Sequence, residues 1–140
     1  MTLRAALSLC AVVVSLLTAA ACDDASTATS PTTSSPVTET FAGQVSVGGA
    51  ASRSFGAASA GTAAITLTQL GPPADVTVGL GVGIPQSGGA GCYLTQAVQA
   101  GASSAPQLTV AVEAGTYCVR LFDTGGLTSP VAFNVTIVRP

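Results

Sequence analysis

Histidine, lysine and tryptophan are absent from this chain of 140 residues, and charged residues make up only 7% of it. Histidine is the commonest general base near neutral pH, and lysine is the residue that forms Schiff bases. Without them, catalysis is restricted to carboxylate, tyrosine or thiol chemistry. The composition therefore argues against an enzyme, and it indicates no cofactor.

Positive charge is also scarce. The chain has four arginines against six acidic residues, and the arginines are scattered along it: Arg4, Arg53, Arg120 and Arg139. Removal of an N-terminal leader that contains Arg4 leaves three arginines against six acids, a side-chain charge of −3. Proteins bind nucleic-acid backbones with clustered cations, so we expect no nucleic-acid partner.

The N-terminus has the pattern of a secretory signal peptide, which we place at residues 1–21. A single positive residue, Arg4, precedes an apolar run from Ala5 to Leu17. This run of about 13 residues is shorter than the roughly 20 of a membrane-spanning helix and fits the core of a signal peptide. Small residues follow the run, and the polarity changes abruptly at Asp23.

Two kinds of cleavage fit the residues before Cys22. Residues 19–21 are all alanine and satisfy the small-x-small rule of the ordinary signal peptidase, which would leave Cys22 as an incidental cysteine. The same residues with Cys22 resemble the lipobox of bacterial lipoproteins, although Ala19 stands where that family most often has leucine. The resemblance implies a diacylglyceryl group and an amide-linked acyl chain on Cys22. The protein would then be exported and attached by lipid to a bacterial cell membrane, at its periplasmic or cell-surface face.

The segment after the cysteine favours the lipoprotein interpretation. Residues 23–40 hold ten Ser or Thr, two Pro and almost no bulky apolar side chain, so they cannot bury enough surface to fold. We expect residues 22–40 to be a lipidated cysteine followed by a disordered linker, which spans roughly 20–25 Å as a coil. Stable attachment to a bilayer takes two acyl chains or more, which a lipobox cysteine carries.

Two of the four cysteines remain for the folded domain. Cys10 lies in the leader and Cys22 is assigned to lipid, which leaves Cys92 and Cys118 in an oxidising compartment. We predict a disulfide between them, which stabilises the fold by roughly 3.5 kcal/mol on the chain-entropy estimate. A redox site would favour a Cys-x-x-Cys pair, and a zinc site needs four ligands. Neither is present, so no metal site is expected.

The remainder, residues 41–140, holds all six aromatic residues and is dominated by apolar residues at every second position. The alternation is clearest in ADVTVGLGVGI, QLTVAVE, GTYCVRLFD and VAFNVTIV, and FAGQVSV and TAAITLTQL behave similarly. Glycine- and proline-rich turns separate these runs. The pattern predicts an all-β domain, an antiparallel β-sandwich of jelly-roll type with about 7–9 strands. Because Cys118 shares a strand face with Arg120, we expect the disulfide near the outer face of the sandwich.

Parts of this domain look like the bacterial pre-peptidase C-terminal domain. Residues 60–70 and 74–80 are similar to its first half, and residues 113–138, where Gly-Thr-Tyr starts a strand, resemble its closing hairpin. The resemblance covers most of residues 41–138 and rests on short motifs. It implies a jelly-roll-like sandwich without catalysis, of the kind appended to secreted hydrolases. Some relatives bind calcium or extracellular polymers, but this chain lacks their acidic cluster and has no tryptophan, so those properties do not carry over.

Several residues are candidates for functional sites. The glycines of VGLGVG alternate within a strand and precede Pro85, so they indicate close approach of another chain or loop, not a phosphate-binding loop before a helix. Glu113 and Asp123 flank one strand and are expected about 30 Å apart as turn residues, too far for a catalytic pair. Tyr93 and Tyr117 adjoin the bridged cysteines, which would bring the rings near each other. Both are candidates for stacking on a sugar or a partner side chain, with core or edge packing as the alternative.

Together these features predict a membrane-anchored lipoprotein of the cell envelope whose non-catalytic β-sandwich binds a protein or a glycan. The alternative is a purely structural component, in which faces rich in glycine, alanine and threonine pack against copies of the chain or other envelope proteins.

Overall fold

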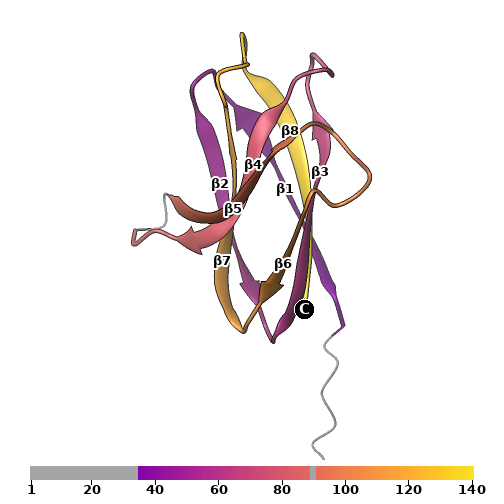
Figure 1. The fold of residues 1–140 in the computed structure, drawn as a ribbon, viewed down its shortest axis with the longest axis vertical. Helices are drawn as coiled ribbons and strands as arrows, with labels where there is room; N and C mark the ends of the chain where they lie inside the picture. The colour runs from indigo at the N-terminus through magenta and orange to yellow at the C-terminus, as the bar shows by residue number, and fades with distance from the viewer. Residues whose placement is uncertain (1–34, 89–90) are drawn as a thin grey trace, which may run out of the picture. The chain divides into compact units, whose positions relative to one another are not determined.

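The computed structural model describes residues 35–88 and 91–140. Within these ranges the chain forms eight β-strands and no helix, and the strands make two antiparallel sheets of four that pack face to face (Figure 1). This confirms the predicted β-sandwich. The predicted signal peptide, Cys22 and the linker up to residue 34 lie outside the described residues. A search of the described segments found no helix with the length and hydropathy that crossing a bilayer requires.

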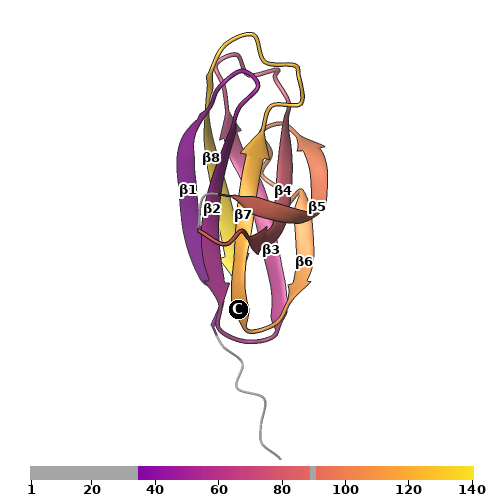
Figure 2. The ribbon, with the colours of Figure 1, turned by 90° about the vertical axis from the view of Figure 1, so that its left-hand side faces the viewer.

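The two sheets have the strand order of a jelly roll. Sheet A contains, in spatial order, β1 (Val37–Val45), β8 (Val131–Arg139), β3 (Gly61–Leu70) and β6 (Leu108–Val112). Sheet B contains β2 (Ala50–Ala57), β7 (Gly115–Phe122), β4 (Val78–Pro85) and β5 (Cys92–Ala100). The chain passes from one sheet to the other after every strand except β4, which continues into β5 as a hairpin (Figures 1 and 2).

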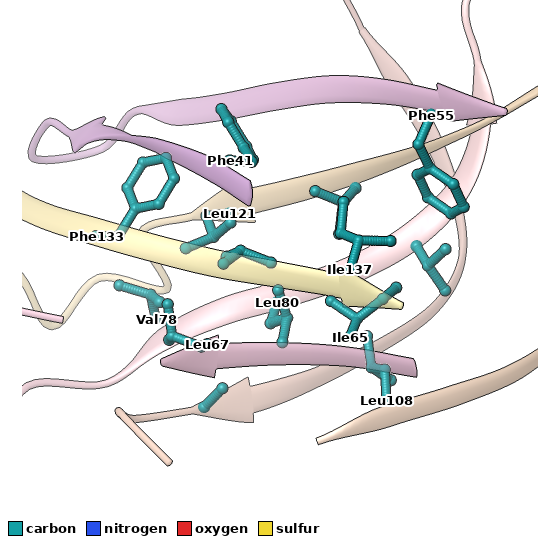
Figure 3. Packing of buried hydrophobic residues seen from close by; sticks show 14 of the residues in the cluster. Phe41, Phe55, Ile65, Leu67, Val78, Leu80, Leu108, Leu121, Phe133 and Ile137 are labelled. Atoms are coloured by element: carbon teal, nitrogen blue, oxygen red, sulfur yellow. The ribbon is translucent and has the colours of Figure 1, made fainter. Parts of the chain in front are cut away.

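Alternating side chains from both sheets fill the space between them. In β8, Val131, Phe133, Val135 and Ile137 are all buried, while the residues between them are partly exposed. Phe133 meets Phe41 of β1 edge to face, with 4.9 Å between the ring centroids (Figure 3). Each buried side chain of this size contributes roughly 1.5–3 kcal/mol, so the row on β8 is a large share of the stability of sheet A.

One predicted boundary is wrong. Residues 37–40 were expected in the linker, but they form the start of β1 and pair with residues 136–139 of β8. Val37 is their only large apolar side chain and it is exposed, which is why composition alone assigned them to a coil. Backbone hydrogen bonding holds them in the sheet, together with an ion pair in which Arg139 Nε lies 3.4 Å from Glu39 Oε1.

Asp123 holds together two loops at one end of the sandwich. Its Oδ1 accepts hydrogen bonds from the backbone N–H groups of Gly125, Gly126 and Leu127, at 2.8, 3.0 and 3.1 Å. Its Oδ2 accepts one from Gly48 N–H at 2.8 Å, which joins the loop after β7 to the turn between β1 and β2. The bond from Gly48 is the largest cause that lowers the pKa of Asp123 below its ordinary 3.8, and partial desolvation opposes it.

This arrangement predicts an acid sensitivity. Because the pKa of Asp123 is lower in the folded state than in the unfolded one, its contribution is present above the ordinary pKa and is lost as the pH falls through the folded value. We expect the melting temperature of an Asp123→Asn variant to fall less than that of the parent on acidification below about pH 4. Asp75→Asn, which changes a carboxylate in the exposed turn before β4, is the control and should behave like the parent. Equal acid sensitivity of the parent and Asp123→Asn would contradict the assignment.

Candidate functional site

The predicted disulfide between Cys92 and Cys118 is present, with 5.8 Å between the two Cα atoms. Cys118 lies in β7 between Tyr117 and Val119, which both pack against the core, so the bridge is on the outer face of sheet B. This agrees with the expected position away from the centre. Both cysteines are nevertheless buried, with 3% and 1% of their surface exposed, so another part of the chain covers them.

The cover is the end of the β4–β5 hairpin. In sheet B, β4 separates β5 from β7, yet β5 and β7 are in contact, and the bridge joins the first residue of β5 to the middle of β7. Pairing between β4 and β5 shifts register between Val82 and Gly83, where an irregularity bends the hairpin. The hairpin projects from the side of the sandwich in Figure 1 and lies in front of β2 and β7 in Figure 2.

Gly81 and Gly83 of β4 leave room for the folded-back hairpin, and Gly79 leaves room for a side chain of β7. Val78, Leu80 and Val82 face the core, so Gly79, Gly81 and Gly83 face outward, yet all three are buried. A Cβ atom on Gly79 would lie 2.2 Å from the ring of Phe122, and one on Gly81 would lie 2.7 Å from Leu94. One on Gly83 would lie only 1.7 Å from the carbonyl oxygen of Tyr93. The prediction that these glycines allow close approach of another chain segment is confirmed.

The opposite side of the hairpin carries two exposed apolar side chains. Ile84 and Tyr93 are direct partners across the β4–β5 pair, and 56% and 66% of their surfaces are exposed. They are the most exposed of the large apolar side chains within residues 35–88 and 91–140, and no charged residue lies between Val78 and Ala100. We refer to Ile84 and Tyr93 as the hairpin pair.

A disulfide and two hydrogen bonds hold the backbone that carries the hairpin pair. The disulfide ties β5 to β7, Gln86 N–H donates to the Gly91 carbonyl at 3.0 Å, and the hydroxyl of Thr95 donates to the Val82 carbonyl at 3.2 Å. A hairpin whose backbone is ordered before binding loses less conformational entropy on binding. Burial of each member against a partner is favourable by about 1.5–3 kcal/mol, so the pair is suited to binding.

Tyr117 has different surroundings from Tyr93. Its ring is half-buried and stacks on Phe55, with ring centroids 5.8 Å apart. Its hydroxyl accepts a hydrogen bond from Glu113 N–H at 2.9 Å and donates to the Glu113 carbonyl at 3.2 Å. This is the arrangement of a tyrosine corner, in which the hydroxyl fixes the backbone a few residues upstream. Tyr93 is thus exposed to solvent, whereas Tyr117 is engaged in packing and in holding the turn before β7.

The acidic residues considered as sites are also separated. Glu113 precedes β7 and Asp123 follows it, as expected for turn residues at opposite ends of one strand. In the part of the chain that the structure describes, no three Cys, Asp or Glu residues are grouped as metal ligands, and no pocket was found. No protein-family model and no curated protein matches the chain.

The sequence indicated Tyr93 but did not indicate Ile84 as its partner. The information was present, because Ile84 and Tyr93 flank a segment rich in proline, glycine and serine, which is typical of a β-turn between paired strands. The segment after the turn was not recognised as a strand, so the pairing could not be assigned.

The glycine contacts predict a position-specific effect of added methyl groups. Gly83→Ala places a methyl group against backbone that cannot move aside, and we expect a loss of about 3 kcal/mol or more in the free energy of unfolding. Gly56→Ala is the matched control in strand β2, where the atom nearest to an added Cβ is the Gly115 carbonyl oxygen at 4.0 Å, and it should be nearly neutral. Chemical denaturation measures both. A Gly83→Ala variant as stable as the control would show that the hairpin does not fold back.

Proposed function

We propose that this protein is an exported lipoprotein, anchored to a bacterial cell membrane through Cys22, whose non-catalytic β-sandwich binds a protein or a glycan of the envelope. The observation that carries the binding proposal is the hairpin pair, Ile84 and Tyr93, which is exposed and held in place by the disulfide. The disulfide itself is typical of an exported protein.

The surroundings of the hairpin pair suit a neutral partner. An exposed aromatic ring stacks on the apolar face of a sugar or on a partner side chain, and exposed apolar anchors often dominate protein interfaces. The hairpin is free of charge, which argues for a partner surface that is recognised by shape and apolar contact, not by long-range attraction.

The arrangement of titratable groups supports a role without catalysis. The chain has no histidine or lysine, Asp123 is saturated with backbone hydrogen bonds, and Glu39 is paired with Arg139. No two of these groups are placed as a nucleophile with a base beside it, which is the usual requirement for acyl, glycosyl or phosphoryl transfer.

The anchor is tested by metabolic labelling with a fatty-acid probe in bacteria that express the full chain. We expect the probe on the parent protein and none on a Cys22→Ser variant, because lipid attachment requires the thiol. Cys10→Ser, which alters the leader but not the lipobox cysteine, is the control and should stay labelled. Labelling of Cys22→Ser at the parent level would rule out the anchor.

The binding surface is tested by a photo-crosslinking amino acid placed at Tyr93 of the full chain in living cells. We expect a crosslinked adduct, to a protein or to wall polysaccharide, from position 93. The same amino acid at Thr109, an exposed position of β6 in the other sheet, should give none. Ile84→Ser should reduce the yield of adduct, because it removes half of the apolar surface. Equal yields from positions 93 and 109 would refute the hairpin as the binding element.

A second candidate function is structural assembly in the envelope. It is favoured by β2, an edge strand of sheet B that is hydrogen-bonded on one side only, to β7. Its outward side chains are all small and exposed: Ala50, Ser52, Ser54 and Gly56. Exposed edges of this kind accept another strand. Self-association of the parent in sedimentation experiments, lost when Ser54 is replaced by proline, would favour assembly over binding of a different partner.

A further inference from the structure

A second surface of sheet B has an unbalanced charge. Arg120 lies in β7 between Val119 and Leu121, which face the core, so its side chain starts on the outer face of the sheet. It is half-buried, and its Nε is shielded from solvent without a hydrogen-bond partner. The one ion pair within the described residues joins Arg139 to Glu39, so Arg120 has no carboxylate beside it. An arginine offers five N–H donors, and a donor that is shielded without a partner, as Nε–H is here, is unfavourable.

The neighbours of Arg120 leave one side open. Towards β4, its partner is Gly81, and the space above that glycine is occupied by Leu94 of the folded-back hairpin. Towards β2, its direct partner is Ser52, a small and exposed residue. Beyond β2 there is no further strand in the sheet. Only the small outward residues of β2, with Ser52 nearest, therefore separate Arg120 from the unpaired edge of the sheet; we call these residues the shelf.

We propose that β2 is the docking edge for an extended acidic peptide of another protein, which adds as a further strand and places a carboxylate on Arg120. Neighbouring strands lie about 4.8 Å apart, so the added strand runs about 10 Å from β7, with only Ser52 between. A glutamate side chain of the peptide and the long side chain of Arg120 meet above this serine. The guanidinium then makes paired hydrogen bonds to the carboxylate, while the backbone of β2 supplies the strand pairing.

The charge at Arg120 favours this partner over a second copy of the chain. If β2 paired with β2 of another copy, the outward side chains next to Ser52 would again be alanine, serine or glycine, and none would bring a carboxylate. This surface is separate from the hairpin pair, and the proposal does not depend on the lipid anchor or on binding at Tyr93.

The test is fluorescence anisotropy of a short, capped, labelled peptide of alternating serine and valine with one central glutamate, titrated with the full chain in detergent. The same peptide with glutamine is the neutral comparison. We expect the glutamate peptide to bind roughly tenfold more tightly, as for a hydrogen bond to a charged group. This preference should disappear in Arg120→Gln. It should persist in Arg53→Gln, because Arg53 occupies the alternate face of β2, and in Tyr93→Ser.

A second variant keeps the test decisive if Arg120→Gln does not fold. Ser52→Leu fills the shelf without altering Arg120, so it should also abolish the preference while the melting temperature stays near that of the parent. Any one of four outcomes would overturn the proposal. The first three are equal binding of the two peptides, loss of the preference in Arg53→Gln, and binding of an oligogalacturonate that depends on Arg120 when the peptide does not bind. The fourth is formation of dimers of the parent that exclude the peptide.

Discussion

The close approach of the β4–β5 hairpin to the outer face of sheet B determines most of the surface described above. It is possible because Gly81 and Gly83 have no side chains where the hairpin bends back, and the disulfide from Cys92 to Cys118 holds the bend in place. The same bend turns Ile84 and Tyr93 towards solvent. In an open hairpin those glycines would leave backbone exposed, and the bridge could not reach β7. The same bend therefore packs the hairpin against the glycines of β4 and exposes Ile84 and Tyr93 to solvent.

The fold class and the disulfide were predictable from the sequence because both depend on local patterns. Strands that bury one face, such as β6, β7 and β8, alternate apolar and polar residues over their whole length, and this alternation predicted them. The disulfide followed from counting cysteines in a chain that was predicted to be exported. The burial of the bridge did not follow, because the segment that covers it was not recognised as a strand.

The strands that were missed, β2 and β5, are the two edges of sheet B. Both bury few side chains, unlike β6 at the edge of sheet A, whose Leu108, Val110 and Val112 are all buried, so neither shows a continuous alternation of apolar residues. In β5 only Cys92 and Ala100 are buried, and in β2 the small outward residues and Arg53 break the pattern. β5 carries Tyr93 of the hairpin pair, and β2 carries the small side chains beside Arg120. The candidate surfaces therefore lie on the parts of the domain where sequence periodicity is least informative. The tyrosine corner of Tyr117 was not predictable either, since it depends on where one hydroxyl meets the backbone.

The position of β8 has a consequence for how the domain is made. This strand lies inside sheet A between β1 and β3, although it is the last of the eight along the chain. A polypeptide that emerges amino end first cannot join β1 to the rest of its sheet until Val131–Arg139 has also emerged. Sheet B contains no part of β8, but the two-layer core cannot close until this last strand has paired with both β1 and β3. The strand order of the jelly roll is by itself enough to make completion of sheet A one of the last steps of folding.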